Sequence, residues 1–285
     1  MQRENVADRC VVMLILLIML CDLTACSPDT EQYNLPAPSD ATEVYKVYLS
    51  DDFDSLPDNI SSDLLVIDGQ YFTDKQITAL HQNNKKIYSY LNIGSLESFR
   101  DYYNQFKNLE ISAYENWDNE YWIDVTEKKW QLFIAEELGP SLLGKGIDGF
   151  FIDNTDLYYN YPEADIYDSL VYMIKELKKT DAGIIINGGD YFLTEYLSEN
   201  GTFDDLLDGV NQECVFTAVN WEDGKFLLND KETTDYFLNY LSSVSTEGKK
   251  VYIIEYCDGE LAARVESKCK KTGYSFYIAD SLSLD

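Results

Sequence analysis

The sequence predicts a single-domain α/β protein folded as an eight-stranded parallel (β/α)8 TIM barrel. From Val44 onward, short apolar runs rich in β-branched and aromatic residues alternate with segments of helical periodicity. This alternation is typical of a parallel sheet whose strands are joined by helices. There are eight such runs, and eight is the number of strands that closes this barrel. The expected domain, residues 44–285, has about the usual length of one.

The predicted strands are short, and polar segments separate them. They cover residues 44–49, 64–68, 86–93, 147–154, 183–187, 209–216, 250–257 and 274–280. Capping residues and apolar periodicity predict helices between them. These helices cover residues 74–84, 130–143, 162–179, 191–199, 231–245 and 259–271.

An open doubly wound sheet is the competing fold. It normally carries a glycine-rich phosphate-binding turn after its first strand. Residues 49–54 stand at that position with three aspartates and no glycine. Because aspartates repel phosphate, the sequence favours the barrel.

The third connection, residues 95–145, is the longest and contains Trp117, Trp122 and Trp130. A long aromatic connection after a barrel strand can form a wall of a substrate site. It can also pack as a satellite of the core. Both interpretations stay open from the sequence.

The N-terminus predicts export. Residues 10–20 form an apolar run too short to span a bilayer, as in the hydrophobic part of a secretory signal. Residues 23–26 (LTAC) resemble the bacterial lipobox, whose cysteine is lipidated. We therefore expect a lipoprotein signal peptide over residues 1–25, a lipid on Cys26, and a flexible Pro-containing tether over residues 26–43. The expected location is the bacterial cell envelope, with the lipid in a membrane.

The formal net charge of −29 excludes nucleic acid as an expected partner, because such a surface repels phosphate backbones. Two interpretations of the charge stay open: a solvated surface that keeps the protein soluble, or adaptation to a cationic polymer. We expect a monomer. Cys214, Cys257 and Cys269 are left in the domain, an odd number that argues against a disulfide framework. Buried free thiols are expected, with one bridge between Cys214 and Cys257 as the alternative.

Two carboxylates stand at predicted strand ends. Asp153 ends the apolar run of residues 146–154, and Glu213 follows Asn211 and Gln212 in the sixth strand. Strand ends on the C-terminal face of a barrel hold its reacting groups. Glycosidic bond hydrolysis needs two carboxyl groups, a proton donor and a second group that meets the developing oxocarbenium ion. The pair therefore predicts acid/base chemistry on a sugar, although either acid alone could be a helix cap or a surface residue.

Other polar residues stand at the same rim, where sugar hydroxyls would need hydrogen-bond partners. We expect substrate contacts from Asp68, Tyr90, Asn92, Asn154, Asn187, Glu255, Tyr256 and Asp280. Strand parity does not decide whether Glu255 or Tyr256 faces inward. Asn92 and Asn187 could instead satisfy local backbone groups, and Asp280 could cap a terminal turn.

The single histidine, His81, lies in a predicted helix. A Ser-His-Asp triad or a zinc site with several histidines therefore cannot be built. No loop shows the alternation of a calcium-binding EF-hand. We expect neither a catalytic metal nor a cofactor.

Taken together, these segments resemble glycoside hydrolase family 114, whose characterised members are endo-α-1,4-polygalactosaminidases. The matching segments are the strand ending at Asp68, residues 90–94, 146–154, 187–188 and 211–216, and the pair Glu255-Tyr256. The resemblance implies a retaining glycosidase with Asp153 as nucleophile and Glu213 as general acid/base. The implied substrate is a galactosamine-containing exopolysaccharide, cationic where it is deacetylated. The alternatives are a non-catalytic glycan-binding lipoprotein on the same barrel and a glycosidase for a different sugar, such as an α-galactoside.

Overall fold

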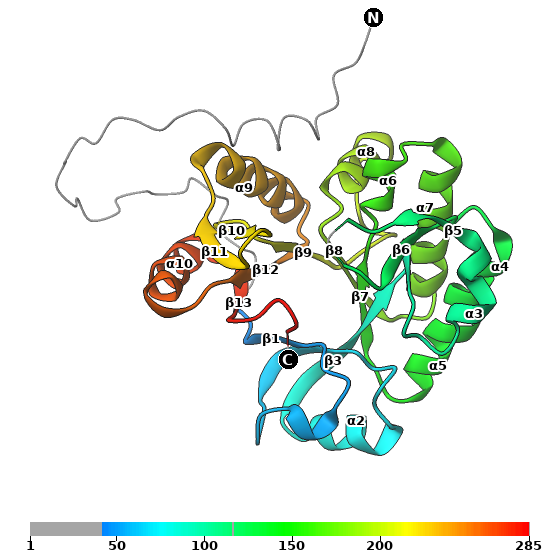
Figure 1. Ribbon diagram of the computed structural model, residues 1–285, viewed down its shortest axis with the longest axis horizontal. Helices are drawn as coiled ribbons and strands as arrows, with labels where there is room; N and C mark the ends of the chain where they lie inside the picture. The colour runs from blue at the N-terminus through cyan, green and yellow to red at the C-terminus, as the bar shows by residue number, and fades with distance from the viewer. Residues whose placement is uncertain (1–41, 116, 285) are drawn as a thin grey trace, which may run out of the picture. The chain divides into compact units, whose positions relative to one another are not determined.

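The computed structural model describes residues 42–115 and 117–284. Within them lies a nearly closed barrel of eight parallel strands with helices on its outside (Figure 1). The strands follow chain order around the barrel: β1 (Tyr45–Tyr48), β2 (Ser62–Ile67), β3 (Asn84–Asn92), β7 (Gly149–Asp153), β8 (Gly183–Asn187), β9 (Gly209–Glu213), β12 (Lys250–Tyr256) and β13 (Ser275–Ala279). All eight predicted strands and the predicted fold class are confirmed. The predicted signal peptide, Cys26 and nearly all of the tether lie outside the described residues.

The first and last strands come together at two points. The Glu43 N–H, just before β1, donates to Ser275 Oγ in β13 at 2.8 Å. At the other end, the Leu49 N–H donates to the Leu284 carbonyl at 2.7 Å. The C-terminal segment is thereby held over the barrel mouth.

The helices largely follow the prediction. They are η1 (Phe53–Ser55), α2 (Asp74–Leu80), α3 (Tyr103–Phe106), η2 (Lys107–Leu109), α4 (Lys128–Leu132), η3 (Phe133–Leu138), α5 (Gly139–Gly144), α6 (Leu157–Asn160), α7 (Ala164–Lys178), α8 (Asp190–Asn200), α9 (Lys231–Thr246) and α10 (Gly259–Thr272). Thr73 and Gln76 form a capping box at the start of α2, which satisfies backbone donors there. Among the described residues, no helix is both long and apolar enough to cross a bilayer.

Two helix predictions need correction. The helix predicted over residues 74–84 ends at Leu80, because Asn84 belongs to β3, where its side chain accepts from Ser62 Oγ at 2.7 Å. The helix predicted over residues 130–143 is interrupted by the π-helical turn η3. Pro140 follows this turn, and since proline has no N–H, it cannot complete an α-helical bond to the preceding turn.

Two antiparallel insertions were not predicted. The third connection contains a small sheet of β4 (Ser95–Glu97), β6 (Glu120–Ile123) and β5 (Glu110–Ala113), and the sixth contains the hairpin of β10 (Thr217–Asn220) and β11 (Lys225–Leu228). Trp122 and Trp130 are only 2% and 0% exposed, whereas Trp117 is 45% exposed. Both interpretations of the third connection therefore hold, each for different tryptophans.

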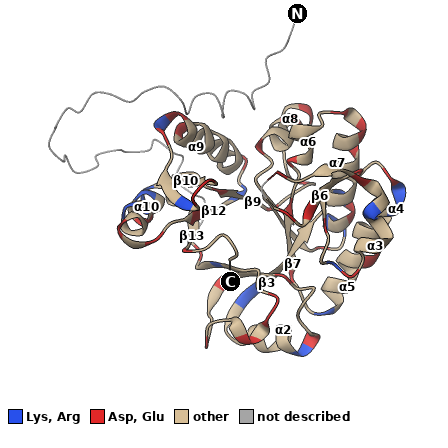
Figure 2. Ribbon diagram, in the orientation of Figure 1, with Lys and Arg blue, Asp and Glu red and all other residues tan. Residues whose placement is uncertain are grey.

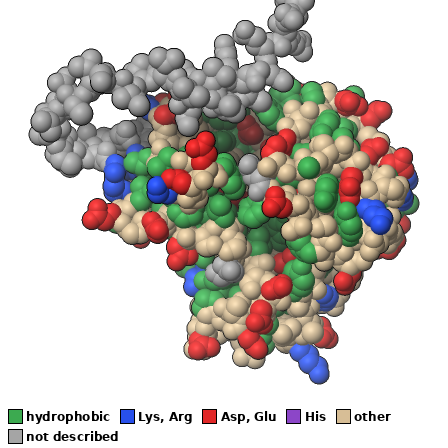
Figure 3. Space-filling view, in the orientation of Figure 1, with side chains coloured by type: hydrophobic (Ala, Val, Ile, Leu, Met, Phe, Trp, Pro, Cys, Tyr) green, Lys and Arg blue, Asp and Glu red, His purple; other side chains and the backbone are tan. Residues whose placement is uncertain are grey.

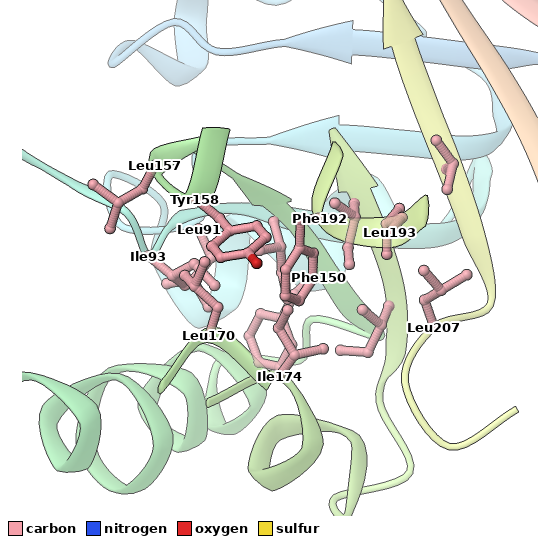
Figure 4. Packing of buried hydrophobic residues seen from close by; sticks show 14 of the residues in the cluster. Leu91, Ile93, Phe150, Leu157, Tyr158, Leu170, Ile174, Phe192, Leu193 and Leu207 are labelled. Atoms are coloured by element: carbon pink, nitrogen blue, oxygen red, sulfur yellow. The ribbon is translucent and has the colours of Figure 1, made fainter. Parts of the chain in front are cut away.

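Apolar side chains pack on both faces of the barrel wall. Outside it, Phe150 of β7 packs with Leu170 and Ile174 of α7 (Figure 4). Inside it lie Phe151 of the same strand and several tyrosines from other strands: Tyr45, Tyr88, Tyr90, Tyr252 and Tyr256. Since successive side chains of a strand point to opposite faces, Asp153 shares the inner face with Phe151.

The surface and the cysteines agree with the sequence. Asp and Glu are spread over most helices and loops, with fewer Lys and Arg among them (Figure 2). Cys214, Cys257 and Cys269 are free. Cys257 and Cys269 are buried as expected, whereas Cys214 is only partly buried.

Candidate active site

Asp153 and Glu213 meet inside the barrel mouth. Asp153 is the last residue of β7 and Glu213 the last of β9, and β8 lies between these two strands. Asn187, the last residue of β8, bridges them: its Nδ2 donates to Asp153 Oδ1 at 3.0 Å and to Glu213 Oε1 at 2.8 Å. The two carboxylate oxygens are therefore no farther apart than these two hydrogen bonds laid end to end.

Each carboxylate also accepts a hydrogen bond from a tyrosine. Tyr90 Oη donates to Asp153 Oδ2 at 2.9 Å, and Tyr256 Oη donates to Glu213 Oε2 at 2.8 Å. Both tyrosines face inward. Tyr90 comes from β3, which pairs with β7, and Tyr256 comes from β12, which pairs with β9. All four carboxylate oxygens of the pair thus have a donor, which fixes the orientation of both groups.

Burial and mutual repulsion favour the protonated form of one member of the pair. Burial raises the pKa of Asp153, although hydrogen bonds from Asn187 and Tyr90 oppose this. Burial also raises the pKa of Glu213, and the negative charge of Asp153 raises it further. Two coupled carboxyl groups of this kind can hold one as an acid while the other is ionised.

A chain of amides sets the orientation of Asn187. Asn211 Nδ2 donates to Asn187 Oδ1 at 2.7 Å, and Tyr45 Oη donates to Asn211 Oδ1 at 3.1 Å. Because the Asn187 oxygen is occupied by this donor, its NH2 group must face the two carboxylates. Residues of the barrel interior thereby position the bridge.

Asn92 and Asn154 are held by a third acid. Asn154 Nδ2 donates to Glu120 Oε1 at 2.7 Å, and Asn92 Nδ2 donates to the same oxygen at 3.0 Å. Ser95 Oγ also donates to this carboxylate. Burial raises the pKa of Glu120. The network joins β6 of the third connection to the ends of β3 and β7, so Asn92 and Asn154 hold the site wall in place.

We expect Gly94→Ala to disturb this wall. A Cβ at residue 94 would lie 1.9 Å from the carbonyl oxygen of Asn154, a backbone atom that cannot move without moving Asp153. Overpacking of this kind costs about 1–3 kcal/mol. The variant should unfold at lower denaturant concentration and lose activity. A matched Gly144→Ala variant, where a Cβ meets nothing within 4 Å, should retain both; equal behaviour of the two would contradict the steric argument.

The pair opens into a cavity of ≈ 750 Å³. In the space-filling view, the face that carries the C-terminal segment is hollowed, with acidic side chains around the hollow (Figure 3). Among the described residues that line the cavity, eight carry carboxyl groups and one carries a guanidinium, Arg100. The acids are Asp51, Asp68, Glu97, Asp118, Glu120, Asp153, Asp156 and Glu213. In the described part of the chain, no group of His, Cys, Asp and Glu is arranged to hold a metal ion.

Asp68 reaches the cavity as a partner of Arg100. The guanidinium donates from Nη1 to Asp68 Oδ2 and from Nε to Glu97 Oε2, both at 2.6 Å. Burial raises the pKa of Glu97 to about 7 against the opposing effect of Arg100. The positive charge of Arg100 is therefore paired with these two carboxyl groups of the protein.

The structure decides between Glu255 and Tyr256. Tyr256 points inward to Glu213, whereas Glu255 is fully buried outside the barrel. Glu255 accepts from the Phe216 N–H at 2.8 Å and from Thr217 Oγ1 at 2.5 Å, which holds the start of the β10–β11 hairpin. Burial raises its pKa to about 7.

Five of the eight residues expected to contact substrate line the cavity: Asp68, Tyr90, Asn154, Asn187 and Tyr256. Asn92, Glu255 and the exposed Asp280 do not. Sequence reasoning missed Glu97, Arg100 and Glu120, which lie in the third connection, and Asp156, which follows Asp153 by three residues. Only the spacing of Asp156 from a strand-end acid could have drawn attention to it.

Exposed aromatic residues rim the cavity. Tyr71, Phe99 and Trp117 line it and are 40%, 56% and 45% exposed. Trp117 also packs edge-on against Trp221 of the β10–β11 turn, with ring centroids 6.4 Å apart. Such faces can stack on sugar rings.

Comparisons with known proteins agree with this architecture. The model of glycoside-hydrolase family GH114 matches residues 27–285. The glycoside hydrolase domain of PelA from Pseudomonas aeruginosa superposes with a TM-score of 0.68 at 16% identity, covering 87% of this chain and 97% of that chain. Aspergillus fumigatus Ega3, solved in complex with galactosamine, gives a TM-score of 0.65 at 16% identity, with 91% and 98% covered.

A third similar structure is the α-galactosidase TtGalA from Thermus thermophilus, with a TM-score of 0.51 at 11% identity over 85% of this chain and 59% of that chain. At these identities the structural likenesses show the fold. No curated protein matches the sequence.

Proposed function

This chain belongs to glycoside-hydrolase family GH114 and is a glycosidase, and we propose that it cleaves an α-linked galactosamine polymer by a retaining mechanism. The observation that carries the proposal is the pair of Asp153 and Glu213 bridged by Asn187. These are the two carboxyl groups that the reaction requires. Neither forms an ion pair with a described residue, unlike Asp68 and Glu97, which both pair with Arg100.

In the proposed first step, Glu213 gives its proton to the glycosidic oxygen as the bond from this oxygen to the anomeric carbon breaks. Asp153 attacks that carbon and forms a glycosyl ester. In the second step, Glu213 removes a proton from water, the water attacks the anomeric carbon, and Asp153 leaves. The raised pKa of Glu213 suits the first role, since the proton must be present when the bond breaks.

The separation of the two groups supports retention. Retaining enzymes hold their carboxyl groups ~5–5.5 Å apart, and inverting enzymes ~6.5–9.5 Å apart to admit a water. The two hydrogen bonds through Asn187, of 3.0 and 2.8 Å, limit the nearest oxygens to less than the inverting range.

The charge of the cavity supports an amino sugar. Eight carboxyl groups and one already paired guanidinium line it. A cationic polymer is therefore attracted to the cavity electrostatically, whereas a neutral polymer is not. Ega3, of the same fold, was solved with galactosamine. We therefore propose α-1,4-linked galactosamine as the substrate.

Reducing-end release across a panel of α-linked galactosamine, N-acetylgalactosamine and galactose oligosaccharides tests this proposal. Proton NMR of the first-formed product should show the α anomer. Cleavage only of galactosides would move the assignment to a different sugar, and binding without release would indicate a glycan-binding protein.

Anchoring in the bacterial envelope is part of the proposal and rests on residues 1–26 of the sequence. Mass spectrometry of the mature N-terminal peptide should find a lipid on Cys26. An unmodified peptide that begins elsewhere would contradict the anchor.

A further inference from the structure

A third carboxyl group lines the cavity beside the catalytic pair. Asp156 follows β7 and lies three residues after Asp153. Its Oδ1 accepts from the Gly189 N–H at 3.2 Å. No described residue donates to its Oδ2, and the side chain is only partly exposed. The mechanism described above does not use this group.

The space beside this free oxygen is kept open by a glycine. Gly188 also lines the cavity, and a Cβ at this position would lie 2.8 Å from Asp156 Oδ2. Any larger residue would therefore occupy the place from which a ligand atom can reach the oxygen.

The surroundings of Asp156 are negative. Burial, Asp190, Asp153 and Glu213 raise its pKa to about 7. The neighbouring tyrosines bring no positive charge: Tyr236 Oη donates to Asp190 Oδ2, Tyr240 Oη donates to the Gly188 carbonyl at 3.1 Å, and Tyr114 lines the same cavity. The cation that lines the cavity among the described residues, Arg100, is paired with Asp68 and Glu97.

A partly buried carboxylate with negative neighbours and no cation beside it is costly for the protein alone. A ligand that brings both N–H donors and a positive charge reduces this cost. A sugar ammonium group does both, whereas an N-acetylated amine has one donor, no charge and a bulkier shape. A hydroxyl supplies a donor without the charge.

We propose that Asp156 Oδ2 receives the ammonium group of an amino sugar, and that Asp156 thereby selects free-amine over N-acetylated units of the polymer. This inference rests on the proposed function and names the residue that sets its specificity. Gly188 is the residue that gives the ammonium group access.

The test compares wild type with Asp156→Asn on free-amine and N-acetylated α-1,4-galactosamine oligosaccharides of equal length. The asparagine keeps Oδ1 for the Gly189 N–H and removes the charge at nearly constant shape. A hydrogen bond to a charged group is worth about tenfold or more in affinity. We therefore expect the ratio of kcat/KM, free amine over N-acetylated, to fall at least about tenfold, mainly through KM for the free amine.

Asp168→Asn is the matched control, since this residue is on the exposed side of α7 and does not line the cavity. It removes the same charge and should leave the ratio unchanged. An unchanged ratio in Asp156→Asn would overturn the inference. An equal loss on both substrates would also overturn it, because that result indicates a contact with a hydroxyl or a structural role.

A second measurement does not depend on turnover. Calorimetry should show that Asp153→Asn binds a free-amine galactosamine oligosaccharide at least about tenfold more tightly than the Asp153→Asn/Asp156→Asn double variant does. Equal binding would overturn the role of Asp156. If wild type cleaves neither oligosaccharide, the proposed function fails, and this binding difference alone decides the inference.

Discussion

Replacing Asp153 with asparagine is expected to lower kcat on the galactosamine polymer by about a thousandfold or more, because the proposed nucleophile is lost. The amide has nearly the same shape, and Tyr90 and Asn187 remain as neighbours. The fold should therefore persist. Thermal unfolding measured beside kcat separates loss of the nucleophile from loss of structure.

Removal of the Asp153 charge should also change its partner. The negative charge of Asp153 raises the pKa of Glu213, so in Asp153→Asn this pKa should fall. The direction follows because a neutral neighbour no longer opposes ionisation of Glu213. Carbon NMR titration of the Glu213 carboxyl group, labelled with 13C, measures this shift directly.

Azide provides a more specific test of the role of Asp153. In Asp153→Gly, which removes the whole carboxyl group, azide can occupy the space of the attacking oxygen and react with an activated α-glycoside. The product should be the β-glycosyl azide, since azide attacks from the nucleophile's side and no second displacement follows. Near wild-type hydrolysis, or an α-glycosyl azide from this variant, would show that Asp153 is not the nucleophile.

The sequence predicts the barrel well because each strand is a local pattern. Residues 150–152 are aromatic or β-branched, with Gly149 before them and Asp153 and Asn154 after them, and no distant contact is needed to identify this strand. The meeting of Asp153 with Glu213 also follows, because carboxyl ends of parallel strands lie at one rim. The Asn187 bridge requires only that the strand between them ends at the same level.

The rest of the site depends on contacts between segments distant in the chain. Glu120 is an unremarkable acid until β6 pairs with β4 and brings it to Asn154, 34 residues away. β4 has three residues, too few for a recognisable period. Tyr256 and Glu255 are adjacent, and only the register of β12 beside β9 shows which one faces Glu213.

Asp156 illustrates the same limit. Its single backbone donor, Gly189, is 33 residues farther along the chain, and its negative neighbours come from β7, β9 and α8. In the sequence it reads as an ordinary turn residue. Its importance arises from what the fold does not provide, a donor for the second oxygen.

Glu213→Gln should lower kcat on the polymer about 10²–10⁴-fold, with a loss that depends on the leaving group. A sugar hydroxyl needs a proton to leave, so the polymer should suffer most. A dinitrophenyl glycoside, whose leaving group is a stable anion, should be cleaved in the first step at a rate much closer to wild type. Pre-steady-state release of dinitrophenol measures this step separately from hydrolysis of the glycosyl ester.

The pH dependence of kcat/KM tests the role of Glu213 as proton donor independently. Burial and Asp153 raise the pKa of Glu213, and the hydrogen bond from Tyr256 lowers it. Wild-type kcat/KM should therefore fall as pH rises through this pKa, and that limb should be absent in Glu213→Gln. Tyr256→Phe removes the opposing hydrogen bond, so the limb should move to higher pH. If the limb persists in Glu213→Gln, or moves to lower pH in Tyr256→Phe, the proton that reaches the leaving group comes from another residue.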